Sequence, residues 1–185
     1  VFNHLTGIST LVKLGDTTLY NETATHPFSV FSDLNHENPF IRNHIKQSLE
    51  YLLTENDVDG FRFDLSKGLT LTNSGDNVGK WSSYDASRIA ILKDYYNTVH
   101  STNPNAVMIL EHFADCGEEK ELAQAGMQLG RNCIHAYSSV MSGNKEDLSA
   151  AYSNQPFGGF VSYMESHDEQ RICYGKAVSV ESASW

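Results

Sequence analysis

Three acidic residues lie where a carboxylate could take part in chemistry. Asp64 follows the apolar run VDGFRF, Glu111 follows the apolar run AVMIL, and Asp168 follows a third short apolar segment. If the first run is a strand, Arg62 and Asp64 share one face, because successive strand side chains alternate between faces. The guanidinium would then keep Asp64 ionised at neutral pH. A carboxylate held in this state is suited to be a nucleophile.

Acids at the ends of neighbouring strands could surround one pocket. Their mutual repulsion would raise the pKa of at least one of them, while Arg62 keeps the pKa of another low. Such a split provides an acid and a nucleophile, which retaining glycoside hydrolysis requires. Glu111 is the natural proton donor, because it would emerge from an apolar wall that disfavours its charged form. Asp168 would be the third, stabilising member.

Each of these residues also has a purely structural interpretation. Arg62 and Asp64 could form a structural ion pair at a sheet edge. Glu111 could be a capping or loop residue after a strand, and His167 and Asp168 could be a hydrogen-bonded loop pair. The joint arrangement, rather than any single residue, favours the catalytic interpretation.

An alternation of helices and strands would position these acids. Apolar residues at helical spacing predict helices at 38–53, 84–100, 118–125 and 144–152. Short apolar runs predict strands at 58–65, 106–110 and 160–164. Strands separated by helices of this length form a parallel sheet, so the expected fold class is α/β. In such sheets catalytic groups gather at the carboxyl edge, and the three expected strands each end in an acid, namely Asp64, Glu111 and Asp168.

Composition limits the class of protein. The chain has 185 residues, 40% of them hydrophobic, which suits a single globular core. Its formal net charge of −10 argues against a nucleic-acid partner, because phosphates require a basic footprint. No apolar stretch reaches membrane-spanning length. Cys116, Cys133 and Cys173 show neither a CxxC pair nor zinc-ligand spacing, so neither a disulfide framework nor a structural metal is indicated.

Four segments, in order, resemble the characteristic segments of the alpha-amylase family, glycoside hydrolase family 13. GFRFDLSK resembles the family's nucleophile segment, GxRxD followed by a lysine. VFNH at the start is similar to the end of the first segment, ILEHF to the general-acid segment, and YMESHDEQR to the final segment. The last of these also resembles bacterial starch-degrading members. The resemblance implies a (β/α)8 TIM barrel.

The resemblance also implies a role for each matched side chain. Asp64 would be the nucleophile, Glu111 the acid/base, and Asp168 the carboxylate that holds sugar hydroxyls in the transition state. The residues that would orient the nucleophile or bind sugar hydroxyls are Arg62, His167, His4 and Lys67. The aromatic candidates for stacking on sugar rings are Trp81, Tyr84 and Phe113.

Some positions differ from the family pattern. Ser166 stands where an asparagine usually precedes the final His-Asp, and Leu110 stands where a glycine often precedes the acid/base. Residues 5–37 would form a short excursion after strand 3 of the barrel, with little room for the family's calcium-binding excursion. We therefore expect no required cofactor, with calcium left open and Asn3 as a candidate ligand.

Length is a further constraint, because a complete barrel typically needs about 250 residues. We expect residues 1–185 to be a fragment of the catalytic barrel, from the end of strand 3 through strand 7. Such a fragment would leave sheet edges open and would be inactive alone. By resemblance, the whole enzyme would be exported.

The expected function is a retaining glycosidase of the alpha-amylase type that cleaves alpha-1,4 bonds within alpha-glucan oligosaccharides or polysaccharides. One alternative is a transglycosylase or isomerase of the same family, which would use the same residues. Another is a non-catalytic relative that binds sugar. A metal-dependent hydrolase would need clustered ligands such as HxH, which the sequence lacks.

Overall fold

The computed structural model describes residues 19–28, 32–152 and 159–174. Its framework is a four-stranded sheet in the order β1-β2-β3-β4, in which all neighbouring strands are parallel. The strands are β1 (Gly60–Phe63), β2 (Val107–Leu110), β3 (Gln128–Asn132) and β4 (Phe160–Tyr163). The predicted α/β class is confirmed.

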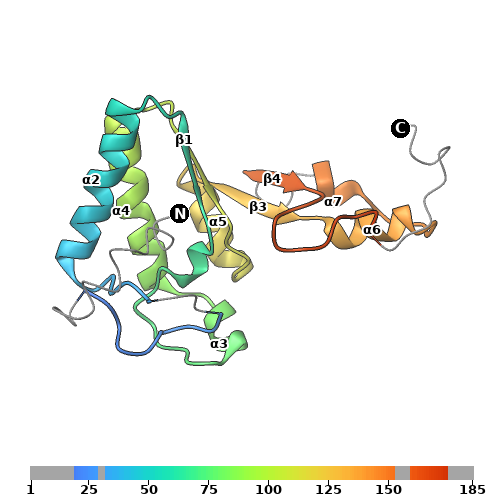
Figure 1. The fold of residues 1–185 in the computed structure, drawn as a ribbon, viewed down its shortest axis with the longest axis horizontal. Coiled ribbons are helices and arrows are strands. Elements are labelled where there is room, and N and C mark those ends of the chain that lie inside the picture. The colour runs from blue at the N-terminus through green and yellow to red at the C-terminus, as the bar shows by residue number, and fades with distance from the viewer. Residues whose placement is uncertain (1–18, 29–31, 153–158, 175–185) are drawn as a thin grey trace.

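Helices connect the successive strands. They are α2 (Pro39–Glu55), α3 (Val78–Ser82), α4 (Ala86–Thr102), α5 (Cys116–Gln124), α6 (Ile134–Met141) and α7 (Ser149–Tyr152), and a 3-10 turn covers Ser66–Gly68. Helices α2 and α4 run side by side, while β3, β4, α6 and α7 extend away from them (Figure 1). Each helical connection places the next strand beside the previous one, as in part of a (β/α)8 barrel.

Capping side chains decide where the two long helices begin. Asn38 Oδ1 accepts a hydrogen bond from the Phe40 N–H at 2.9 Å, and Pro39 occupies the first turn of α2, as the sequence predicts. Helix α4 begins at Ala86, two residues later than predicted. The reason is that Asp85 is its cap, with a carboxylate that accepts from backbone N–H groups of the first turn.

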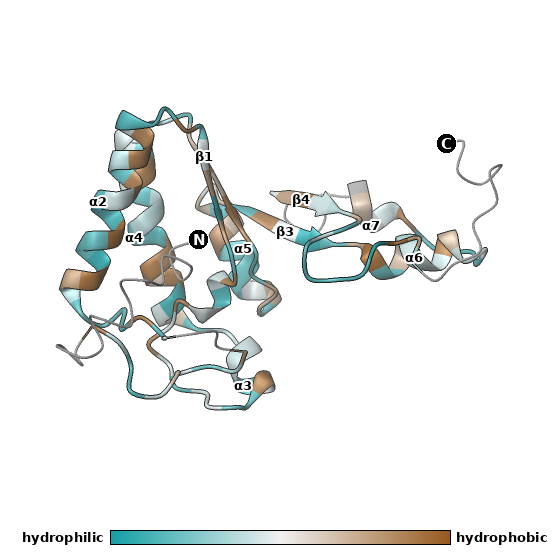
Figure 2. Ribbon diagram, in the orientation of Figure 1, coloured by the Kyte–Doolittle hydropathy of each residue, from teal (hydrophilic) through white to brown (hydrophobic). Residues whose placement is uncertain are grey.

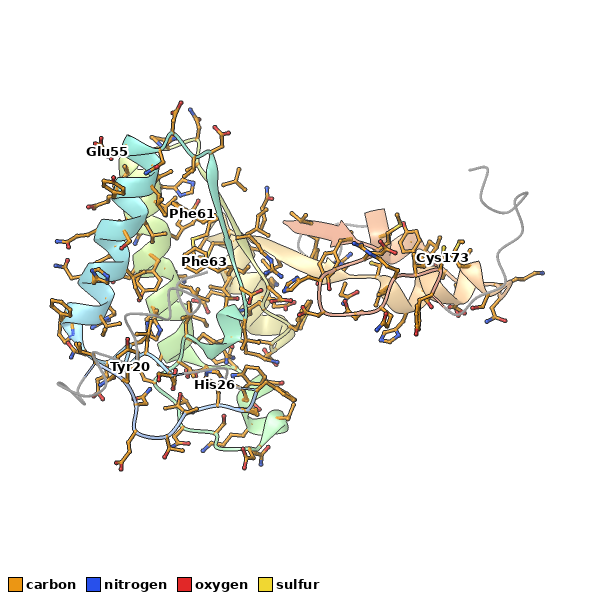
Figure 3. All side chains as sticks on the ribbon, viewed as in Figure 1. Tyr20, His26, Glu55, Phe61, Phe63 and Cys173 are labelled. Carbon is orange, nitrogen blue, oxygen red and sulfur yellow. The ribbon has the colours of Figure 1, made fainter. Side chains whose placement is uncertain are left out.

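The hydrophobic core lies between the helices and one face of the sheet. Figure 2 shows apolar and polar residues interleaved along α2 and α4, as expected of helices with one buried face. Phe61 and Phe63 lie along β1 (Figure 3) and pack against this core, where the ring of Phe63 stacks on Tyr95 with centroids 6.3 Å apart. Fully buried members of the core include Leu49, Leu92, Tyr95, Leu110 and Leu129.

The start of β1 requires a glycine. A Cβ at Gly60 would lie 2.1 Å from the carbonyl oxygen of Val107 and 2.7 Å from its nitrogen. No side chain tolerates so close an approach. The glycine therefore allows β1 to pair with β2 from its first residue.

Strand β1 is shorter than the predicted strand at 58–65. Leu65 adopts the left-handed conformation, with φ 44° and ψ 42°, and the chain then turns into the 3-10 segment. Leu65 therefore does not continue the strand face of Phe61 and Phe63. As a result, Asp64 lies at the point where the strand ends.

Strand β3 and helices α3 and α6 were not predicted, and one predicted helix was too long. Strand β3 contains the polar sequence QLGRN, and it forms because β2 and β4 provide backbone partners on both sides. Helix α6 follows it directly. The predicted helix at 144–152 is wrong over its first half, because only α7 is helical there.

Most of the expected excursion at 5–37 lies outside the described residues, as do Asn3 and His4. In the parts that are described, an isolated antiparallel bridge joins Tyr20 and Leu34. Among the described helices, none combines the length and the apolar character that a membrane span needs.

Candidate active site

Asp64 and Glu111 emerge side by side from the carboxyl ends of β1 and β2. The register pairs Phe63 with Leu110, so the next residue of each strand is an acid. The Glu111 N–H also donates to the Phe63 carbonyl at 2.9 Å. Alternation along the strands puts both acids on the side of Arg62, opposite the face that packs against the core.

One guanidinium binds both acids. Arg62 Nη1 donates to Asp64 Oδ1, and Arg62 Nη2 lies 3.2 Å from Glu111 Oε1. The second oxygen of Glu111, Oε2, accepts from the Leu65 N–H at 3.0 Å. The Glu111 side chain is 12% exposed and that of Asp64 is 33% exposed. The two acids are therefore held together, with Glu111 in the drier position.

Their pKa values move in opposite directions. Burial raises the pKa of Asp64, but the hydrogen bond and charge of Arg62 outweigh burial, so this pKa lies below its ordinary value. Burial raises the pKa of Glu111, the Leu65 N–H and Arg62 offset only part of this, and the charge of Asp64 raises it further. A hydrogen bond between the two carboxyls adds to both shifts. Glu111 therefore keeps its proton at a pH where Asp64 is already ionised.

The loop after β4 brings His167 and Asp168 to this edge. His167 Nε2 lies 3.9 Å from Asp64 Oδ1 and 3.3 Å from Asp168 Oδ1, and the side chains of both loop residues are exposed. The imidazole thus stands between the two carboxylates. Five of the residues singled out in the sequence therefore gather here, namely Arg62, Asp64, Glu111, His167 and Asp168.

Glu169 ties this loop to the sheet. Its Oε1 accepts from Asn132 Nδ2 at 2.5 Å, at the end of β3, and its Oε2 accepts from Ser166 Oγ. Ser166 Oγ in turn accepts from the Asp168 N–H at 3.2 Å. Ser166, which stands in place of the family's usual asparagine, therefore supports the backbone of Asp168.

Lys67 lies behind the site rather than on its open surface. Its side chain is buried, and Nζ donates to the Phe113 carbonyl at 3.0 Å and to Ser82 Oγ at 3.1 Å. The ammonium group also lies 4.0 Å from the centroid of the Trp81 ring, and burial lowers its pKa. These contacts join the turn after β1 to the turn after β2 and engage the ammonium group within the protein.

The three aromatic candidates differ in their access to solvent. Trp81 is buried and stacks on His26 with ring centroids 5.4 Å apart, so it presents no face to a sugar. Tyr84 and Phe113 are exposed. These two rings are the ones that a ligand could reach.

A buried polar network lies behind the two acids. The Ser66 N–H donates to the Glu111 carbonyl at 3.0 Å, and Ser66 Oγ lies 2.9 Å from that carbonyl and 3.0 Å from His112 Nδ1. His112 Nε2 lies 2.8 Å from Glu118 Oε1. Arg88 then donates to Glu118 through Nε at 2.5 Å and through Nη2 at 2.7 Å. Ser66, His112, Glu118 and Arg88, which we call the rear network, are all buried.

The rear network, Asn132 and Tyr163 were not predicted from the sequence. Asn132 was missed because β3 carries no strand pattern. Tyr163 closes a strand that was predicted, and burial together with the charge of Glu111 raises its pKa to about 12. The burial of Arg88 could have been predicted, because this residue lies beside the apolar stripe of α4.

No group of three metal-ligating side chains occurs within residues 19–28, 32–152 and 159–174. Asn3, the candidate calcium ligand, and His4 lie outside these ranges. The expectations about calcium and about His4 as a sugar contact therefore remain predictions.

Replacing Glu118 with glutamine tests how strongly the rear network stabilises the fold. The change leaves the Arg88 guanidinium buried without its counter-charge, so we expect the free energy of unfolding to fall by about 3–5 kcal/mol. Chemical denaturation followed by circular dichroism measures this loss.

Glu121→Gln on the same helix is the matched control. Glu121 also pairs with a cation of α4, since Lys93 Nζ lies 2.6 Å from its carboxylate, but these side chains are 39% and 36% exposed. We expect that variant to lose less than about 1 kcal/mol. Equal losses in the two variants would contradict the role given to burial.

The family model described as the alpha amylase catalytic domain matches residues 19–179. A search of curated proteins finds no match. The solved structure of Eubacterium rectale Amy13B aligns with 20% identity and a TM-score of 0.47, over 70% of this chain and 25% of that one. This chain therefore spans a quarter of the length of that structure. On the family match, the protein belongs to the alpha-amylase family, glycoside hydrolase family 13.

Proposed function

We propose that this chain carries the catalytic centre of a retaining glycosidase that cleaves alpha-1,4 bonds within alpha-glucans. The observation that carries the proposal is the pair of carboxyls on one guanidinium, Asp64 and Glu111, at the ends of adjacent parallel strands. Membership of the alpha-amylase family supports an alpha-glucan as the substrate. The preference for internal alpha-1,4 bonds is part of the proposal.

The close approach of the two carboxyls favours retention of configuration. An inverting enzyme needs its two carboxyls about 6.5–9.5 Å apart, so that a water molecule fits between one of them and the sugar. Here Arg62 binds both groups, and they also hydrogen-bond to each other. The shared guanidinium keeps the two carboxyls close, which suits direct attack by a carboxylate.

In the proposed reaction Asp64 attacks the anomeric carbon and forms a covalent glycosyl-enzyme. Glu111 gives its proton to the glycosidic oxygen, and the bond between that oxygen and the anomeric carbon breaks. Glu111, now ionised, takes a proton from a water molecule as the water oxygen bonds to the anomeric carbon. The bond between that carbon and Asp64 then breaks, which restores the Asp64 carboxylate and the protonated Glu111. Arg62 keeps Asp64 ionised before the attack, which is the state that a nucleophile needs.

Asp168 and His167 are proposed to bind sugar hydroxyls. Both side chains are exposed, and His167 lies near both Asp64, the proposed nucleophile, and Asp168. A carboxylate and an imidazole bind hydroxyls directionally. Lys67 is not included among these sugar contacts, because its ammonium group is buried and hydrogen-bonded to the Phe113 carbonyl and Ser82.

Asp64→Asn in the protein at its full natural length tests the proposal. The amide removes the nucleophile without changing the size of the side chain, so we expect turnover of soluble starch to fall by about a thousandfold or more. Asp94→Asn is the matched control, because Asp94 pairs with Lys46 on the helical side of the structure, away from the acids. Reducing-end release measures both.

Turnover close to the wild-type level in the Asp64→Asn variant would remove Asp64 from the role of nucleophile. The products formed by the wild-type enzyme separate hydrolysis from transfer. Water as the acceptor gives shorter glucans alone, whereas a transglycosylase also gives products longer than the substrate.

The dependence of kcat/KM on pH should be bell-shaped. Asp64 must be ionised, so activity rises as pH increases through its pKa, which lies below the ordinary 3.8. Glu111 must be protonated, so activity falls as pH increases through its pKa, which lies above the ordinary 4.5. Arg62 lowers both pKa values, so Arg62→Gln should move both limbs of the curve to higher pH. Limbs that stay in place would show that Arg62 does not set these pKa values.

A further inference from the structure

Ser66, His112 and Glu118 form a chain of buried hydrogen bonds that ends at Glu111. We infer that these three residues position Glu111 for proton donation, an inference that rests on the proposed function. They do not touch the substrate, so they are positioning residues rather than catalytic ones. The function of these residues depends on which atom of each group donates.

The three residues have the order serine, histidine, glutamate, which in other hydrolases activates a serine nucleophile. That activity does not fit this site. Ser66 and Glu118 are completely buried and His112 is 1% exposed, so no substrate reaches the hydroxyl. The same hydrogen bonds can still orient Glu111, at which this series of hydrogen bonds ends.

The ionised state of Glu118 determines which group donates in each of these hydrogen bonds. Burial raises its pKa, but hydrogen bonds from Arg88 and His112 outweigh burial, so Glu118 is ionised and only accepts. His112 therefore donates its Nε2–H to Glu118 Oε1. Because burial lowers the pKa of His112, the ring is neutral and its Nδ1 is an acceptor. Ser66 Oγ, 3.0 Å away, is the group that can donate to Nδ1.

Ser66 holds the backbone of Glu111. Its N–H donates to the Glu111 carbonyl at 3.0 Å, and its Oγ lies 2.9 Å from the same oxygen. The hydroxyl has one proton, which it can give to either this carbonyl or His112. Ser66 also fixes the turn that contains Leu65, whose N–H donates to Glu111 Oε2. The orientation of both the backbone and the carboxyl of Glu111 therefore depends on Ser66.

The backbone around this chain needs such support. Leu65 and Phe113 both have positive φ, 44° and 52°, although neither is a glycine. Residues in this conformation persist when the surrounding structure determines them. Leu65 directly precedes Ser66, and Phe113 directly follows His112. The hydrogen bond between Ser66 and His112 thus joins the two strained turns that carry the acids.

The test compares two substrates in a Ser66→Ala variant of the full-length protein. Cleavage of soluble starch needs a proton from Glu111, whereas α-maltotriosyl fluoride has a leaving group that departs without one. We expect kcat/KM on starch to fall about tenfold or more, and kcat/KM on the fluoride to change less than about twofold. A loss of folded enzyme would lower both values equally, so the ratio reports positioning.

Ser74→Ala is the matched control, since Ser74 is also buried and its Oγ donates to the Thr25 carbonyl, which is not part of the site. That variant should leave the ratio of the two kcat/KM values unchanged. His112→Asn provides a second variant that breaks the same chain, and it should show the same selective loss as Ser66→Ala.

Equal losses on the two substrates in the Ser66 and His112 variants, or no loss on either, would overturn the positioning role. Failure of the proposed function gives a different result. In that case the wild-type protein itself would cleave neither starch nor the fluoride, and the positioning role would fall with it.

Discussion

The binding of two carboxyl groups to one guanidinium is the interaction on which the rest of this site depends. Two acids this close would repel each other if both were ionised. Arg62 stabilises the negative charge of Asp64, and burial raises the pKa of Glu111, so between their two pKa values the pair carries one charge rather than two. The parallel register, which ends β1 and β2 at the same level, is what makes this contact possible.

A second group of charged side chains, the ion pair of Arg88 and Glu118, lies behind the two acids. Arg88 and Glu118 are fully buried, and such an ion pair is costly to desolvate unless every donor and acceptor has a partner. Arg88 meets this condition by also donating to the carbonyls of Lys67, Trp81 and Ser83. Helices α4 and α5 are thereby connected to the turns that hold the acids. In this way the packing of these helices is linked to the positions of Asp64 and Glu111.

The sequence allows some features of this site to be predicted and hides others. Strands β1 and β2 were predictable because GFRF and VMIL are strongly apolar, and the opposite pKa shifts follow from Arg62 and from the apolar run before Glu111. Strand β3 was not, because QLGRN has no strand pattern and depends on partners distant in sequence. The burial of Lys67 was also hidden, because Trp81 and Phe113 surround it only after folding.

The most direct measurement of the central claim is a carbon-13 NMR titration of the carboxyl carbons of Asp64 and Glu111. We expect Asp64 to titrate below its ordinary value of 3.8 and Glu111 above its ordinary value of 4.5, with each signal also reporting the titration of the other acid. The reverse order, or two carboxyls that titrate independently at their ordinary values, would contradict the account.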